Sequence, residues 1–195
     1  MPSILLITAL LPRAEAAWPS GGDWEPLTNS SGIVYDNADV VGSQQLDLVS
    51  DKDATGYWAI DSTTLYLRMR LGGEPCSSYD KNGDCELLYA NSTYAVLMST
   101  DGVAENYEYA LALVNYGLDL SLLENTDGQS DWMAPWGTEL SAETNAITSG
   151  FARVLEAGSS TGSNPDYFLD LQIDLSVLQA HIGASYDSDL RIALA

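Results

Sequence analysis

The sequence predicts an all-β protein, an antiparallel β-sandwich with one short helix. Residues 65–71 and 107–113 alternate between apolar and more polar side chains, which is typical of strands that bury one face. Clusters of Gly, Asn, Asp and Ser separate the candidate strands, as turns do. The chain does not alternate strands with long helical patterns, so we expect a sandwich and not a parallel α/β sheet.

Each element is predicted from its own pattern. Apolar and β-branched runs bounded by turn residues predict ten short strands, at residues 32–41, 44–50, 56–60, 65–71, 94–99, 107–113, 118–123, 151–155, 167–173 and 190–194. Asp174 can cap a helix over residues 175–181, which Gly183 would end. The long polar stretch 126–145 is expected to form a functional loop or an ordered excursion across the surface.

Length and charge restrict the organisation of the chain and its partners. The 195 residues are the size of one domain. An apolar run over residues 4–11, followed by Ala14 and Ala16, is typical of a signal peptide. We therefore expect residues 1–16 to be a leader and residues 17–195 to be one secreted, extracellular or cell-surface domain.

The net charge is −21, with 28 acidic and 7 basic side chains, which argues against nucleic acid and anionic membranes as partners. After removal of the leader, no apolar run reaches transmembrane length, and no membrane insertion is expected.

The two cysteines, Cys76 and Cys85, enclose eight residues. In an exported chain this spacing predicts a disulfide that closes a small loop. In a cytosolic chain the same residues would be free thiols. Two cysteines and one histidine argue against a structural zinc site and against a Cys–His nucleophilic pair.

Several longer segments carry a resemblance to a known family. The segments YDNADVVG (35–42), GYWAID (56–61) and LYLRMRL (65–71) resemble the start of secreted bacterial modules with a fold like family 9 carbohydrate-binding modules and DOMON domains. YAVLMSTDG (94–102), YEYAL (107–111) and YFLDLQIDLS (167–176) agree with it. The likeness covers roughly residues 32–195. It implies a jelly-roll-like sandwich and a non-catalytic module.

Acidic residues within the cysteine loop predict a calcium site. Asp80, Asn82, Asp84 and Glu86 stand at alternate positions, the spacing at which a calcium loop wraps oxygen ligands around one cation. Cys85 stands where an EF-hand has its glycine, and Asn91 where it has a bidentate glutamate. The loop is therefore not an EF-hand, and a solvated acidic hairpin tip is the alternative interpretation. Other candidate ligands lie in two further acidic groups, Asp36, Asp39 and Asp47 in one and Asp101 in the other.

Aromatic side chains in predicted loops are candidates for ligand contact. Trp132, Trp136 and Tyr116 lie outside the predicted strands, and exposed aromatic faces stack on sugar rings or pack against a partner. Trp18, Trp24 and Tyr79 belong to the same class. The alternative is that the loop tryptophans fold down over the ends of the sandwich.

These observations predict a non-catalytic module and no enzyme. His181 is the only histidine, and no strand–turn–helix nucleophile motif accompanies it. Met69 and Met98 are expected to fill the core, so no haem is expected. The first hypothesis is a calcium-supported sandwich that binds carbohydrate or another extracellular surface polymer. The alternative is a structural subunit that assembles with copies of itself into a filament or surface layer.

Overall fold

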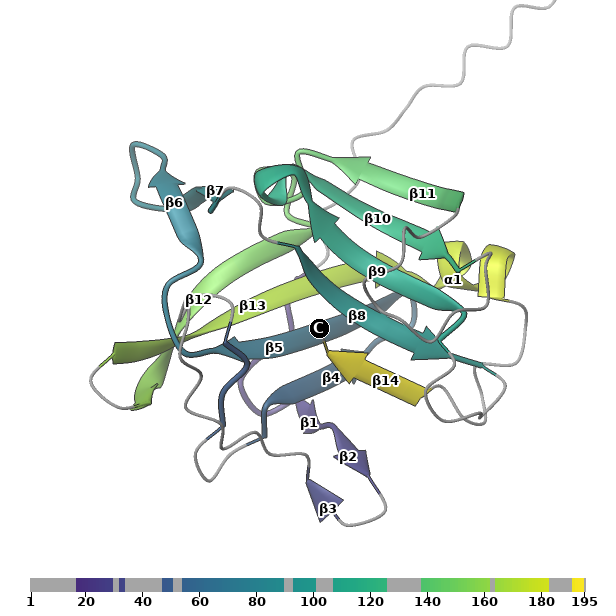
Figure 1. Ribbon diagram of the computed structural model, residues 1–195, viewed down its shortest axis with the longest axis horizontal. Helices are drawn as coiled ribbons and strands as arrows, with labels where there is room; N and C mark the ends of the chain where they lie inside the picture. The colour runs from purple at the N-terminus through teal and green to yellow at the C-terminus, as the bar shows by residue number, and fades with distance from the viewer. Residues whose placement is uncertain are drawn as a thin grey trace, which may run out of the picture.

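The chain folds as a β-sandwich, as predicted (Figure 1). The computed structural model describes residues 17–29, 32–33, 47–50, 54–89, 93–100, 107–125, 138–161, 164–182 and 191–194. Two five-stranded antiparallel sheets lie face to face. Within the described ranges, no helix is long and apolar enough to cross a membrane. The predicted leader, residues 1–16, lies outside them.

The first sheet is built around two long central strands. Its order is β1 (Glu25–Pro26), β4 (Gly56–Ile60), β5 (Thr64–Leu71), β13 (Asn164–Asp174) and β12 (Ala152–Thr161). The turn between β4 and β5 is closed by Asp61, whose Oδ1 accepts hydrogen bonds from the backbone amides of Thr63 and Thr64 at 2.7 and 2.8 Å. The hydrogen bond from the Thr63 amide is the main reason why the pKa of Asp61 lies below its ordinary value.

The second sheet contains a strand that the sequence analysis assigned to a loop. Its order is β11 (Thr138–Thr144), β10 (Asp119–Glu124), β9 (Tyr109–Val114), β8 (Tyr94–Ser99) and β14 (Arg191–Leu194). Of the two expectations for residues 126–145, a functional loop is wrong for residues 138–144, which form β11, and residues 126–137 lie outside the described residues. This strand lies at the edge of its sheet and is largely polar, so it lacks a clean alternation. Its register shifts between Leu122, which pairs with Ser141, and Leu123, which pairs with Glu139. Leu140 is the extra residue at this irregularity, and it packs against the core.

Smaller elements complete the fold. The predicted helix is confirmed as α1 (Leu175–Ile182), which buries Leu178. Two short hairpins pair β2 (Thr28–Asn29) with β3 (Gly32–Ile33) and β6 (Cys76–Tyr79) with β7 (Cys85–Leu88). Between β9 and β10 lies a short turn, η2 (Asn115–Gly117). The second predicted strand, 44–50, is described only from residue 47 and forms an isolated bridge from Leu48 to Leu71.

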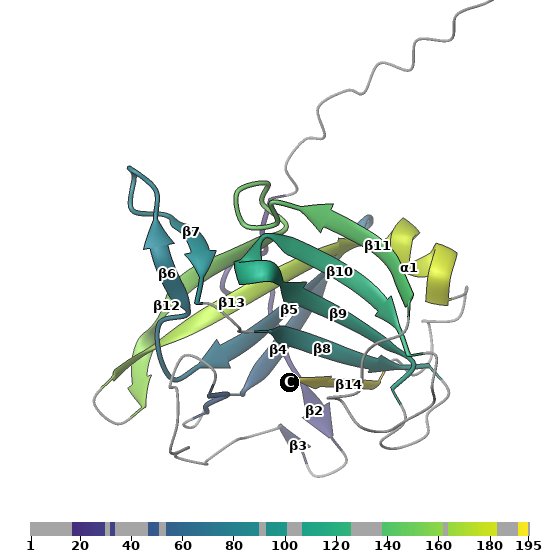
Figure 2. The same cartoon turned by 45° about the horizontal axis from the view of Figure 1, so that its top comes forward.

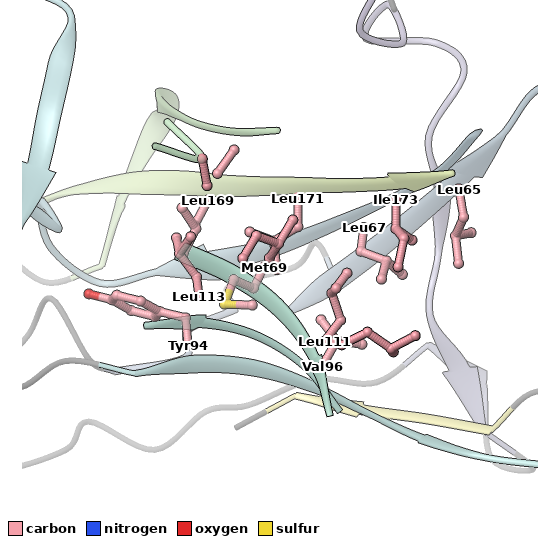
Figure 3. Packing of buried hydrophobic residues seen from close by; sticks show 14 of the residues in the cluster. Leu65, Leu67, Met69, Tyr94, Val96, Leu111, Leu113, Leu169, Leu171 and Ile173 are labelled. Atoms are coloured by element: carbon pink, nitrogen blue, oxygen red, sulfur yellow. The ribbon is translucent and has the colours of Figure 1, made fainter. Parts of the chain in front are cut away.

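The core lies between the two sheets (Figure 3). Alternate residues of β5 and β13 face β8 and β9, as the period of two requires. The buried set includes Leu65, Leu67, Met69, Leu169, Leu171, Ile173, Tyr94, Val96, Leu111 and Leu113. The sheets approach closely at Gly56, where a Cβ would lie 2.5 Å from Leu194 Cδ1 and 2.8 Å from Leu27 Cδ1. Any larger residue would push these contacts apart.

The central strand β5 is buried on both faces, whereas the sequence predicted one buried face. All eight of its residues are buried. Its outward side chains include Tyr66, Arg68 and Arg70. Polar groups at such positions need partners, and the partners come from distant parts of the chain.

Candidate functional site

The cysteines form the predicted disulfide. Cys76 and Cys85 are bonded, with their Cα atoms 5.8 Å apart. The bond ties together the strands β6 and β7. Figures 1 and 2 show this hairpin standing out from one end of the sandwich.

The hairpin tip is closed by Asp80. Its Oδ1 accepts hydrogen bonds from the backbone amides of Asn82 and Asp84 at 2.8 and 2.9 Å, and its Oδ2 accepts one from Asn82 Nδ2 at 3.0 Å. The amide of Asp84 contributes most to holding the pKa of Asp80 below its ordinary value. Gly83 takes a left-handed conformation with φ +88°, which suits glycine in a tight turn.

Calcium at this loop stays a prediction. Asp84 and Glu86 are exposed, and Asp80 caps the turn. In the part of the chain that the structure describes, no group of three or more His, Cys, Asp or Glu side chains is placed to hold a metal ion. Asp47, from the second acidic group, is buried near the end of β5, where its backbone oxygen accepts a hydrogen bond from the Gly72 amide at 2.9 Å. The other predicted ligands, Asp36, Asp39 and Asp101, lie outside the described residues.

Tyr116 stands on an unusual backbone turn. Asn115, Tyr116 and Gly117 follow one another with φ of +51°, +64° and +82°. Asparagine and glycine tolerate the left-handed region, but a bulky tyrosine is a genuine outlier there. The Tyr116 side chain is 49% exposed. The other two predicted ligand aromatics, Trp132 and Trp136, lie outside the described residues.

The turn at Tyr116 packs directly against the base of the hairpin. A Cβ on Gly117 would lie 2.8 Å from Leu88 Cγ and 2.8 Å from Ile147 Cδ1, so only glycine allows this approach. Leu88 is fully buried at the end of β7, and the next residue, Tyr89, is exposed. The Tyr89 amide donates to the Pro75 carbonyl at 3.1 Å and so extends the hairpin ladder. Both views show β7 beside the turn between β9 and β10 (Figures 1 and 2).

Three exposed tyrosines therefore lie at one end of the molecule, on the hairpin and on the turn that it packs against. Tyr79, Tyr89 and Tyr116 are 46%, 44% and 49% exposed; we call them the tyrosine end. By contrast, Tyr66 and Tyr94 are 1% and 2% exposed. The sequence analysis named Tyr116 and Tyr79 as candidates for ligand contact and missed Tyr89. The signal for Tyr89 was its place just after the disulfide-closed loop.

Carboxylates accompany two of these three rings. The Tyr79 hydroxyl donates a hydrogen bond to Glu74 Oε1. Asp119, three residues after Tyr116, accepts a hydrogen bond from the Asn115 side-chain amide. Exposed tyrosines and carboxylate oxygens thus occur together on the hairpin and on the turn beside it.

A second polar cluster lies on the outer face of the first sheet and was also missed. Arg68 makes a bidentate ion pair with Asp170, Nε to Oδ1 at 2.6 Å and Nη2 to Oδ2 at 2.8 Å, and Arg153 Nε reaches Oδ2 at 2.8 Å. Arg70 and Ser159 bond to Asp166 Oδ2, with Arg70 Nη2 at 2.8 Å and Ser159 Oγ at 2.9 Å. The side chains of both aspartates are fully buried. Three of the seven basic residues of the chain lie on this face.

Two tryptophans from the N-terminal segment cover this cluster. Trp24 lies over the Arg68 guanidinium with 4.0 Å between Cζ and the ring centroid, and Phe168 lies at 4.3 Å. Trp18 lies over the Arg153 guanidinium at 4.4 Å. Cation–π contacts of this kind stabilise a desolvated guanidinium. The sequence left open whether these tryptophans are exposed for ligand contact or pack onto the protein. The structure supports packing, and the two rings cover a face of the sheet and not an end of the sandwich.

The histidine and the two strand methionines lie in different parts of the protein. Met69 and Met98 are buried in the core, and His181 lies at the exposed end of α1, where its backbone oxygen accepts a hydrogen bond from the Tyr109 hydroxyl at 3.3 Å.

No protein-family model, curated protein or solved structure matches this chain. Function is therefore argued from the geometry.

Proposed function

We propose that this domain is a non-catalytic, extracellular β-sandwich module that binds a carbohydrate polymer through its tyrosine end. The main observation that supports this proposal is that Tyr79, Tyr89 and Tyr116 are 44–49% exposed at one end of the sandwich. Exposed aromatic residues that gather in one region of a surface mark a contact site, whereas singly scattered ones need no explanation. A tyrosine offers an apolar ring for stacking and a hydroxyl for hydrogen bonding, which suits a sugar ring with its apolar face and polar edges.

The backbone at Tyr116 supports the same proposal. A left-handed conformation costs a non-glycine residue roughly 1–2 kcal/mol. Strained positions of this kind cluster at binding and catalytic sites. Glycine at position 116 would fold without this cost, so the presence of a tyrosine there favours a role for its ring.

The test is binding of the purified domain to a panel of immobilised and soluble polysaccharides, measured by affinity electrophoresis and calorimetry. Tyr116→Gly removes the ring and relieves the backbone, so it should fold. Truncation of an aromatic anchor typically costs more than about 1–2 kcal/mol of binding free energy, or roughly tenfold in Kd. We expect Tyr116→Gly to lose about that much on the polymer that the domain binds.

The control is Ile60→Ala. Ile60 is 48% exposed and lies at the opposite end of β5 from the hairpin, across the ladder from Leu65. It should leave binding unchanged. Equal losses in both variants, or no binding to any polymer on the panel, would reject the proposal.

Self-assembly into a filament or layer remains the alternative function. Size-exclusion chromatography and electron microscopy of the isolated domain, with and without calcium, distinguish the two. A concentration-dependent polymer whose formation is abolished by Tyr116→Gly would reassign the tyrosine end to contact between copies of the chain.

A further inference from the structure

The negative charges around the tyrosine end indicate which class of polysaccharide could bind there. Five carboxylates and one ammonium group lie on the hairpin, on the residues just before it and beside the adjoining turn. The carboxylates belong to Glu74, Asp80, Asp84, Glu86 and Asp119, and the ammonium group belongs to Lys81. Polysaccharides that carry carboxylate or sulfate groups would be repelled from this surface.

We propose that the tyrosine end prefers a cationic glycan, a polymer of amino sugars with free ammonium groups, over its neutral N-acetylated counterpart. This inference rests on the proposed function. The supporting feature is the pairing of an exposed ring with a carboxylate, since the Tyr79 hydroxyl bonds to Glu74, together with the Asp119 carboxylate, which bonds to Asn115 on the turn that carries Tyr116.

The chemistry of an amino sugar fits this pairing. Its pyranose ring can stack on a tyrosine while its ammonium group reaches a neighbouring carboxylate. An ammonium also interacts favourably with the face of an aromatic ring. A neutral acetamido sugar keeps the stacking interaction and loses both electrostatic ones.

The experiment compares glucosamine oligomers with N-acetylglucosamine oligomers of equal length, by calorimetry at about pH 6, below the ordinary pKa of an amine. We expect the glucosamine oligomer to bind more tightly, with an affinity that falls as salt increases. In Glu74→Gln, binding of the glucosamine oligomer should weaken about two- to fivefold, the effect of losing one exposed cation contact. Binding of the acetylated oligomer should stay unchanged.

A second charge variant tests whether the glucosamine oligomer is attracted only by the overall negative charge of the protein. Glu25→Gln removes the same charge from an exposed position on β1, a strand that lies well away from the hairpin (Figure 1). Equal weakening in Glu25→Gln and Glu74→Gln would overturn the inference, because the attraction would then be unspecific. Equal affinity for the two oligomers would overturn it as well, and the proposed function would stand. Binding that Tyr116→Gly leaves intact for both oligomers would overturn the proposed function itself.

Discussion

Asp170 is the point at which the largest effect of a single substitution is expected. Its fully buried carboxylate pairs with two guanidiniums, of Arg68 and Arg153, whose side chains are 10% and 27% exposed. Asp170→Asn keeps the shape of the side chain and removes the charge. It leaves Arg68 as a buried cation between two aromatic rings.

The magnitude follows from burial. Removal of one partner from a buried ion pair typically costs 3–5 kcal/mol of unfolding free energy. The part due to Arg153 is smaller, about 1 kcal/mol or less, because that side chain is over a quarter exposed and solvent screens it. For a domain of this size each kcal/mol lowers Tm by roughly 2–4 °C. We therefore expect Asp170→Asn to lower Tm by about 6–20 °C.

The assay is urea unfolding followed by tryptophan fluorescence, with Arg153→Met as the control that should cost about 1 kcal/mol or less. The double variant Asp170→Asn with Arg68→Met should recover part of the loss, because no buried cation remains unpaired. An Asp170→Asn protein within about 0.5 kcal/mol of the parent would refute the argument, since water or another group would then be compensating Arg68. So would a double variant less stable than Asp170→Asn.

Four further predictions concern turns, the disulfide and metal. The pKa of Asp61 lies below its ordinary value, so the stability it contributes is present above the unfolded pKa of about 3.9 and is lost as pH falls through the lower folded value; a carboxyl titration by NMR that gives an ordinary or raised value would contradict this. Gly117→Ala should destabilise by roughly 1–3 kcal/mol, because the φ of +82° is strained for alanine and its Cβ would lie 2.8 Å from Leu88, and an unchanged urea midpoint would count against it. Reduction of the disulfide should loosen the hairpin and cost about 2–3 kcal/mol without unfolding the core; hydrogen exchange that spreads evenly over both sheets would argue otherwise. Millimolar calcium should raise stability by roughly 0.5–1.5 kcal/mol for a site of ~0.1–1 mM affinity; equal Tm values in calcium and in sodium chloride of matched ionic strength would exclude the site, and an effect that survives Asp80→Asn with Asp84→Asn would move it elsewhere.

The strands could be predicted because their signal is local. The expected boundaries of β4 and β8 agree with the structure at both ends, and β5 begins one residue earlier than expected. Alternation and turn residues decide such segments without reference to the rest of the chain. The edge strand β11 was not predicted, because a strand at the edge of a sheet buries less apolar surface than a central strand. Its polar residues are typical of loops as well.

The ion-pair network could not be predicted because it depends on register. Arg68 and Asp170 are 102 positions apart in the chain, and only the pairing of β5 with β13 brings them together. The sequence did show that Arg68 and Arg70 alternate with core residues in one strand. Two arginines on a predicted strand, in a chain with seven basic residues, indicate paired groups on the outer face without indicating which carboxylates pair with them.

The two polar clusters have different physical roles because water reaches them differently. On the outer face of the first sheet, the carboxylates of Asp166 and Asp170 are fully buried, and the rings of Trp24 and Phe168 lie over the guanidinium of Arg68, which pairs with Asp170. The charges of this cluster therefore act on folding. At the tyrosine end the rings are almost half exposed, so their surface is available to a partner. The turn that carries Tyr116 is costly for tyrosine, and the packing of Leu88 against Gly117 holds it in place. A sandwich stabilised on one face can thus carry a strained, exposed aromatic residue at its end, and under the proposed function this ring contacts the polymer and the buried ion pairs stabilise the fold.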